Sequence, residues 1–445
     1  MLRLDESALG EQTGRLLGDL IRINTVNPPG QERPAQELLA ELLAAAGFEC
    51  ELLGAHAQRP NLLARLRGAQ PGPTLGLLGH TDTVLADAAD WSHDPWSGEL
   101  ADGFLWGRGA IDMKSQVAAE TIAAASLARA GWRPARGDLL VLAVVDEETG
   151  GALGAQWLTR SHPEKARCDM LLNEGAGQVF EYGGIRRYGV SCAEKGVFRF
   201  TVRTRGAAAH ASTPRMGENA LLKLAPLLRR FAERAPSYAL TAQARALLEA
   251  LGEDPAQPAA AVARMRREDP RLPALLEPVL GVSLTPTKAS ASQKINVIPS
   301  VAELGIDCRV PPGLGEREAR AAIAEVLGDE REEGFEIEFT DCIAGNSSAI
   351  DSPLMDAIRQ WLAERDPHAL AVPTVMPGFT DSRHFREAFP ECVAYGFFPQ
   401  RHQSLLDGWP LMHGADERID IRDLGFAAQC YADLTMRLLG SAKKV

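Results

Sequence analysis

A histidine and an aspartate follow an apolar segment early in the chain, in a pattern that can bind a metal ion. Residues 74–78 (TLGLL) read as a buried strand that runs into GHTDTV, so His80 and Asp82 lie where the strand gives way to a loop. Side chains two residues apart on an extended backbone lie on one face. Because a metal-bound imidazole usually donates its second N–H to a carboxylate, Asp82 is placed to orient His80. Taken alone, such a pair is common without a metal.

Two further apolar segments end in carboxylates. Residues 138–145 (DLLVLAVV) lead into three consecutive acids at 146–148 and then two glycines, and residues 169–172 (DMLL) lead into Glu174. Carboxylates gathered at one strand end repel one another, and a bound cation relieves that repulsion. A surface run of acids would simply be solvated, but this run follows an apolar segment. We therefore expect a cation site at one edge of the sheet. In open α/β sheets, ligands bind outside the carboxyl ends of the strands.

The apolar periodicity of the first part of the chain alternates between strand and helix, which is typical of an α/β fold. Helices are predicted over 6–23, 34–45 and 116–130, and short edge strands over 48–53 and 61–67. Near residue 192 the pattern changes to strands with one polar face, such as GVFRFTVRTR.

The middle of the chain reads as a separate α+β domain. Its predicted elements are a strand at 196–205, a helix at 218–233, strands near 282–286 and 301–309, a helix at 316–327 and a strand at 335–340. This is the ferredoxin-like order. The Ala-, Pro- and Arg-rich segment 239–280 is either a dimer contact or a solvated insertion, and we favour the insertion.

The remaining elements return the chain to the first domain. They are a helix at 352–364, strands at 372–376 and 393–397, and a last helix at 421–439. We therefore predict a catalytic domain in two parts, 1–191 and 346–445, with a mixed, mostly parallel sheet flanked by helices. Residues 192–345 would form an inserted ferredoxin-like lid and dimerisation domain.

Composition restricts the class of protein. The 445 residues suggest two domains, and 45% hydrophobic with 24% charged residues is typical of a soluble globular protein. A net charge of -12 argues against nucleic acid and anionic membranes as partners. With no signal sequence and no membrane-spanning apolar run, a cytoplasmic location is the default expectation. The seven cysteines form no CxxC and read as free core thiols, so the metal ligands should be His and carboxylate.

Five motifs, in one order along the chain, resemble those of a known enzyme family. They are GHTDTV, GRGAIDMK, DEETGG, NEG and MHGADERI. The chain is similar in this to the dinuclear-zinc amidohydrolases and peptidases (M20-type metallopeptidases), which include aminoacylase, acetylornithine deacetylase, succinyl-diaminopimelate desuccinylase and glutamate carboxypeptidase. The resemblance covers nearly the whole chain.

The resemblance implies two zinc ions, with Co²⁺ or Mn²⁺ in substitution. Asp112 would bridge them, with His80 and Glu174 completing one site and Glu148 and His413 the other. All five offer nitrogen or oxygen donors that zinc accepts. His402 and His384 are rivals for the last ligand, and His413 is preferred because it stands in the family's closing HGADE motif.

Glu147 is left as the general base, because neighbouring side chains at a strand end point in different directions and Glu148 is the ligand. His210 stands in GAAAHASTPRMGENA, which resembles a family motif whose histidine reaches the site of the partner subunit. There it would donate a hydrogen bond to the developing oxyanion. A homodimer is therefore expected.

The resemblance also suggests substrate contacts. Asn296 and Arg309 match lid residues that hold a substrate carboxylate, which the planar fork of an arginine suits. The alternative is that Arg309 pairs with Asp307 or Glu303 on its own strand. The stretch GFTDSRHF resembles the family's pocket loop and supplies the candidates Gly378, Thr380 and Arg383.

Three departures from the family pattern leave the pocket shape open: Leu85, Ser115 and Phe379. We expect a hydrolase that cleaves an amide bond in an N-acyl amino acid or a short peptide with a free carboxylate. A dipeptidase or aminopeptidase of the same family is the nearest alternative. A metal-binding module without turnover is a more distant one, because such a module would have relaxed at least one ligand.

Overall fold

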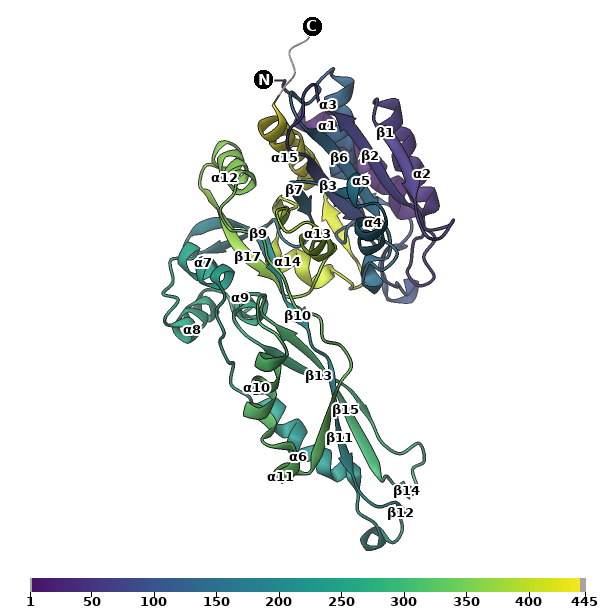
Figure 1. The fold of residues 1–445 in the computed structure, drawn as a ribbon, viewed down its shortest axis with the longest axis vertical. Coiled ribbons are helices and arrows are strands. Elements are labelled where there is room, and N and C mark those ends of the chain that lie inside the picture. The colour runs from purple at the N-terminus through teal and green to yellow at the C-terminus, as the bar shows by residue number, and fades with distance from the viewer. Residues whose placement is uncertain (1, 441–445) are drawn as a thin grey trace. The chain divides into compact units, whose positions relative to one another are not determined.

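The computed structural model describes residues 2–440, except for the side chains of residues 331 and 332. It divides into two compact units, seen in Figure 1. Unit 1 comprises Met1–Cys192, Ser348–Thr374 and Thr380–Val445, and unit 2 comprises Ala193–Ser347 and Val375–Phe379. The domain boundaries given above stay a prediction, because compactness does not show which segments fold independently.

The main sheet of unit 1 has the strand order β1-β2-β6-β3-β7-β18-β9-β8-β19, with β17 paired to β9. The strands are β1 (Glu49–Leu53), β2 (Asn61–Arg67), β3 (Leu75–His80), β6 (Asp138–Val144), β7 (Met170–Asn173), β8 (Gln178–Tyr182), β9 (Ile185–Glu194), β17 (Ala369–Met376), β18 (Val393–Gly396) and β19 (Gln400–Ser404). Strands β6, β3, β7 and β18 run parallel to one another. Their carboxyl ends therefore lie at one edge of the sheet. The expectation that 61–67 is an edge strand is wrong, since β2 lies between β1 and β6.

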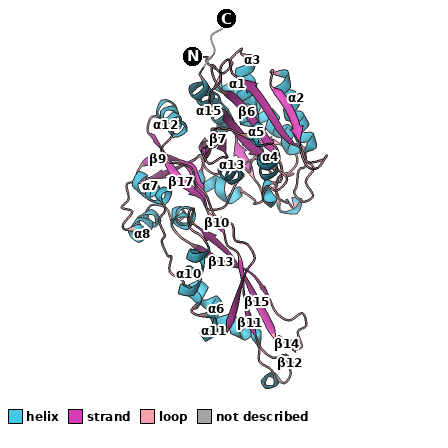
Figure 2. Ribbon diagram, in the orientation of Figure 1, coloured by secondary structure: helices cyan, strands magenta, loops and turns pink. Residues whose placement is uncertain are grey.

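Helices cover both faces of this sheet (Figure 2), which confirms the predicted α/β fold. One face packs against α1 (Glu6–Arg22), α2 (Arg33–Ala45), α3 (Lys114–Arg129), α12 (Pro353–Arg365) and α15 (Ile421–Leu439). The other packs against α4 (Ala155–Ser161), α5 (Pro163–Ala166) and α13 (Ser382–Ala388). In β6, Val141 faces the first helix layer and Leu140 and Leu142 face the second. This alternation explains why β6 is apolar at nearly every position.

Unit 2 has the predicted order of strands and helices. Its elements are β10 (Gly196–Val197), β11 (Phe200–Arg205), β12 (Ala209–His210), α6 (Ala220–Glu233), β13 (Ser283–Ser290), β14 (Val297–Ile298), β15 (Val301–Val310), α10 (Glu316–Leu327), α11 (Glu330–Glu333) and β16 (Phe335–Phe339). The antiparallel sheet places β15 between β13 and β11, with β16 beyond β11. Residues of α6 and α10 form one core with the buried face of β15. The segment 239–280 folds into α7 (Ala242–Ala250), α8 (Pro258–Glu268), α9 (Leu272–Leu276) and a short turn.

Several elements were not predicted. The segment between GHTDTV and GRGAIDMK contains β4 (Leu100–Ala101) and β5 (Phe104–Trp106), and β5 pairs with β20 (Arg418–Asp420). Strands β8 and β9 form an antiparallel hairpin. The expectation that every cysteine is a core thiol is wrong for Cys342, which is exposed, while Cys50 is half-buried and packs against the core. Within residues 2–440, no helix combines the length and apolarity needed to cross a membrane.

Candidate metal centre

The carboxyl edge of the parallel strands brings together the residues predicted to bind metal. His80 is the last residue of β3, and Glu174 directly follows β7. Glu148 lies in the short turn after β6. Asp112 comes from the loop before α3, and His413 from the loop before β20. Residues separated by more than three hundred positions in the chain therefore meet at one place in unit 1.

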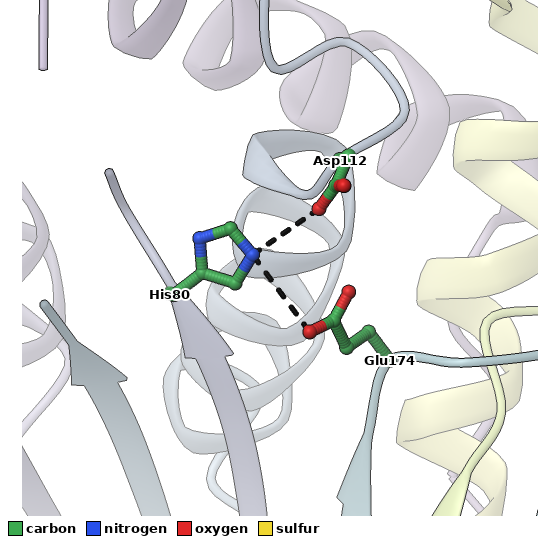
Figure 3. A group of neighbouring side chains, drawn as sticks. All are labelled: His80, Asp112 and Glu174. Atoms are coloured by element: carbon green, nitrogen blue, oxygen red, sulfur yellow. Dashed lines mark hydrogen bonds and ion pairs between the residues drawn. The ribbon is translucent and has the colours of Figure 1, made fainter. Parts of the chain in front are cut away.

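The first ligand group is His80, Asp112 and Glu174 (Figure 3). The Nε2 atom of His80 lies 3.2 Å from Oδ1 of Asp112 and 3.8 Å from Oε1 of Glu174. The His80 side chain is only 1% exposed. A single ion can therefore reach one nitrogen and two carboxylate oxygens.

The second ligand group is Asp112, Glu148 and His413. The Nε2 atom of His413 lies 3.0 Å from Oδ2 of Asp112 and 3.4 Å from Oε2 of Glu148. In each group the candidate ligand atoms lie within 4.8 Å of one another. Asp112 thus offers one carboxylate oxygen to each group, which is the arrangement of a bridging ligand.

The chemistry of these residues fits divalent cations. Burial, followed by the nearby charge of Asp112, raises the pKa of Glu174 well above its usual value. Hydrogen bonds with Asp112 and Glu148 raise the pKa of His413 to about 10. Within the described part of the chain, the buried Oε1 atom of Glu148 has no hydrogen-bond partner. Crowded carboxylates and a buried oxygen without a donor are what a cation would stabilise.

Glu147 lies beside both ligand groups and belongs to neither. Its side chain is 11% exposed, and Oε2 lies 4.0 Å from Nε2 of His80. Burial and then the charge of Glu174 raise the pKa of Glu147 well above its usual value. The turn that carries Glu147 begins at Asp146, which has a left-handed backbone with φ of 72°. Glu148 belongs to the second ligand group and Glu147 does not, so the two neighbouring carboxylates occupy different places.

The contact between Asp82 and His80 differs in part from the expectation. Nδ1 of His80 lies 3.0 Å from the main-chain oxygen of Asp82 and 3.5 Å from its carboxylate Oδ1. The main-chain carbonyl is therefore the nearer acceptor. The carboxylate accepts hydrogen bonds of 3.2 Å from the main-chain N–H groups of Glu147 and Glu148. Burial opposes the charge on Asp82, yet the contacts with His80 lower its pKa below the usual value.

Glu417 supports Asp112, a role for which no sequence prediction was made. Its Oε1 accepts hydrogen bonds from the main-chain N–H groups of Ile111 at 2.6 Å and Asp112 at 3.0 Å. Its Oε2 accepts one from Nη1 of Arg108 at 2.5 Å. Glu417 is fully buried. The signal was present in the sequence, since Glu417 stands four residues after His413 in MHGADERI.

The two rival histidines lie outside both ligand groups. Nε2 of the buried His384 lies 3.3 Å from the main-chain oxygen of Gly150. His402 is exposed on β19. Neither is among the described residues that form the metal-ligand groups. The geometry favours His413 as the final ligand.

The remaining candidates divide between the units. In unit 1, Thr380 is buried and its Oγ1 accepts hydrogen bonds from Nδ2 of Asn173 at 3.3 Å and from the main-chain N–H of Ser382 at 3.2 Å. Arg383 is half-buried on α13. Gly378 belongs to unit 2.

The lid candidates all belong to unit 2. His210 ends β12, its ring is exposed, and Nδ1 lies 2.7 Å from Oγ of Ser212. The main-chain oxygen of the exposed Asn296 accepts a hydrogen bond from the main-chain N–H of Ala211, so His210 and Asn296 are neighbours. Arg309 donates from Nε to Oδ1 of Asp307 at 2.7 Å. The pairing on its own strand that the sequence left open is thus present.

Comparisons with known proteins agree with this geometry. The model of peptidase family M20/M25/M40 matches residues 76–437. The succinyl-diaminopimelate desuccinylase of Cereibacter sphaeroides is 26% identical over 417 residues, covering 92% of this chain and 94% of that protein. The succinyl-diaminopimelate desuccinylase of Paracoccus denitrificans is 36% identical over 221 residues, covering 48% of this chain and 54% of that protein.

Solved structures share the fold. The M20 family metallo-carboxypeptidase Sso-CP2 from Sulfolobus solfataricus has a TM-score of 0.74 and 16% identity, covering 96% of this chain and 99% of that chain. Human carnosine dipeptidase 1 has a TM-score of 0.68 and 16% identity, covering 98% of this chain and 97% of that chain. At these identities the likeness extends to the fold alone.

Proposed function

Since the chain belongs to peptidase family M20/M25/M40, we propose that it hydrolyses the amide bond of an N-acyl amino acid or of a short peptide with a free carboxylate. Family membership makes it a hydrolase of amide bonds that uses a divalent metal. The names of the relatives given above, which are desuccinylases, support an N-acylated substrate. One observation carries the proposal: two ligand groups share Asp112, and Glu147 lies beside them.

We further propose that the metal is a pair of zinc ions. His80, Asp112 and Glu174 would hold one ion, and Asp112, Glu148 and His413 the other. When bound, such a pair polarises the scissile carbonyl and lowers the pKa of the attacking water. The all-nitrogen and oxygen donor set also accepts Co²⁺ or Mn²⁺.

Glu147 acts in this proposal as the proton carrier. It accepts a proton from the attacking water and then donates it to the leaving amine, so that a neutral amine departs. Its carboxylate lies next to the ligands without joining either group, which leaves its oxygens available for the water. Asp82 orients His80 through its main-chain oxygen and its carboxylate.

Substrate recognition in this proposal uses the candidates that the sequence named. Asn296 and Arg309 would bind the free carboxylate, and Gly378, Thr380 and Arg383 would line the pocket. The guanidinium of Arg309 would release Asp307 when it binds the substrate carboxylate, because one guanidinium cannot form paired hydrogen bonds with both carboxylates at once. His210 would act on the site of a partner subunit in a homodimer.

A substrate panel tests the proposal. The protein, loaded with zinc, is assayed with N-succinyl and N-acetyl amino acids, with unmodified dipeptides, and with the same acyl amino acids as amides that lack the free carboxylate. We expect hydrolysis of the acylated acids, loss of turnover after chelator treatment, and weak activity on the amides. Preference for unmodified dipeptides would favour the dipeptidase alternative. If the protein binds metal but hydrolyses none of these amides, the alternative of a metal-binding module without turnover would be favoured instead.

A further inference from the structure

The side chain of Asn27 connects the residues that carry the metal ligands. Asn27 is 6% exposed and lies in a loop far from the ligands in sequence. Its Nδ2 donates to Oδ2 of Asp82 at 2.8 Å and lies 3.2 Å from Oδ1 of Asp146. It also lies 3.2 Å from Oγ1 of Thr149. One amide therefore bonds to two buried carboxylates that would otherwise repel each other.

The backbone of Asn27 is fixed on the same structure. Its main-chain N–H donates to the main-chain oxygen of Thr83 at 2.9 Å, and Val26 and Thr83 form a parallel bridge. The loop that carries Asn27 is thus attached directly after Asp82. These main-chain bonds fix the backbone from which the amide reaches Asp82 and Asp146.

Each carboxylate that Asn27 contacts orients a different part of the metal centre. The oxygens of Asp82 accept from the main-chain N–H groups of Glu147 and Glu148 and face the ring of His80. Asp146 begins the turn that carries both glutamates, and its Oδ2 accepts from the main-chain N–H of Leu153 at 3.0 Å. A donor that joins Asp82 to Asp146 fixes the strand end of His80 relative to that turn.

Arg59 balances the charge of this cluster from the other side. Its Nη1 lies 3.1 Å from Oδ1 of Asp146, and its guanidinium binds the buried Glu32 with distances of 2.6 Å and 2.9 Å. The Arg59 side chain is 11% exposed. Arg59 thus contacts Asp146, whereas Asn27 donates a side-chain hydrogen bond to Asp82, which also accepts from the main-chain N–H groups of Glu147 and Glu148. Asn27 therefore contacts both carboxylates through one nitrogen and adds a second connection between Asp82 and the turn.

We propose that Asn27 is a positioning residue of the metal centre, whose amide fixes the Asp82 carboxylate against the turn that carries Glu147 and Glu148. The inference rests on the proposed function. Groups that hydrogen-bond a metal ligand directly typically change metal affinity about 10- to 100-fold when they are lost. Asn27 acts one step further out, through Asp82, so Asn27→Ala should weaken zinc binding by a smaller factor, up to about 10-fold, in a protein that still folds.

The experiment measures zinc affinity by chelator competition and the absorption spectrum of the Co²⁺-loaded protein. Asn24→Ala is the matched control, because Asn24 lies three residues earlier, is exposed, and its Oδ1 accepts from the main-chain N–H of Val26 in the same loop. We expect weaker binding and an altered cobalt spectrum for Asn27→Ala, with Asn24→Ala like wild type. A merely structural role would lower the unfolding temperature of the metal-free protein without altering the cobalt spectrum.

A second variant covers the case in which Asn27→Ala does not fold. Thr149→Val removes the hydroxyl of an exposed residue, which donates to Oδ1 of Asp146 at 2.7 Å, and it should weaken zinc binding in the same direction by a smaller factor. Wild-type zinc affinity and cobalt spectrum in the variants that fold would overturn the role of Asn27, while an active wild type would leave the proposed function standing. A wild type that neither retains metal nor hydrolyses an amide would instead overturn the proposed function.

Discussion

Glu147 and Glu148 are chemically identical neighbours to which the proposed mechanism gives different tasks, and of the two only Glu148 belongs to a ligand group. Glu147→Gln keeps the shape of the side chain and removes its ability to accept a proton. We expect zinc stoichiometry to remain near two while kcat falls about 10²- to 10⁴-fold, the usual contribution of general acid–base catalysis. Metal analysis and steady-state kinetics check this. Glu164→Gln, an exposed glutamate of α5, is the control, and turnover that survives in Glu147→Gln would remove the role.

Metal binding should release protons. Hydrogen bonds with Asp112 and Glu148 raise the pKa of His413 to about 10, and contacts with Asp112 raise that of His80 despite its burial. The His413 ring therefore carries a second proton at pH 7 in the metal-free protein and must lose it to coordinate, and the upward shift at His80 acts in the same direction. The metal-bound state binds fewer protons, so zinc affinity should rise with pH through the range below about 10. Calorimetry in two buffers of different ionisation enthalpy measures the release, and identical heats in both buffers would contradict it.

At the scale of the elements, the loop before α3 depends on a buried ion pair. Glu417 binds Arg108 and the main-chain N–H of Asp112, and both charged side chains are at most 3% exposed. Glu417→Ala leaves the Arg108 charge buried without its partner, which should cost about 3 to 5 kcal/mol of unfolding free energy. Zinc affinity should fall as well, because Asp112 loses its anchor. Urea unfolding of the metal-free protein and chelator competition measure the two effects.

The matched control for this change is Glu49→Ala. Glu49 pairs with Arg67 at 3.0 Å, but both side chains are more than 60% exposed. Such surface pairs contribute about 0.2 to 1 kcal/mol. Equal destabilisation by the two substitutions would mean that the Arg108–Glu417 pair does not hold the loop.

The elements that the sequence predicts best are those whose apolar residues recur with one regular period. The helix 316–327 and the last helix 421–439 have the predicted bounds, because each has a continuous apolar stripe and a glycine after its end. The hairpin of β8 and β9 was missed, although Gly183 and Gly184 between two apolar runs are a hairpin signal. Strand β2 was wrongly placed at an edge, since pairing order depends on contacts far apart in sequence.

The site residues divide in the same way, into those recognised from local sequence and those whose role depends on distant partners. That the residues of the two ligand groups and Glu147 lie together could be predicted, because each stands in a short motif at the end of a strand or in a loop. Asn27 was missed because its partner Asp82 lies 55 residues away. Glu417 stands in the motif MHGADERI, but its role was missed because its partner Asp112 lies 305 residues away. The partner of the His80 ring was predicted as a carboxylate, and the nearer acceptor is a main-chain oxygen that sequence does not reveal.

At the scale of the whole molecule, the predicted homodimer makes each active site depend on two chains. If His210 acts on the partner subunit's site, His210→Ala and Glu147→Gln homodimers should both be nearly inactive. A mixture of the two variants, unfolded and refolded together, should regain activity, because one site of each hybrid dimer then has an intact Glu147 and an intact His210. Sedimentation gives the oligomeric state and kinetics the recovery. A monomer with full activity, or no recovery in the mixture, would contradict the role of His210 across the dimer.

The location of bound metal tests the central claim most directly. Anomalous diffraction at the zinc edge, from crystals of the protein loaded with zinc, locates each ion without reference to the ligands assigned here. Two peaks are expected, one contacted by His80 and Glu174, the other by Glu148 and His413, with Asp112 touching both. A single peak, or peaks elsewhere in the chain, would contradict the shared metal centre and the catalytic role of Glu147 with it.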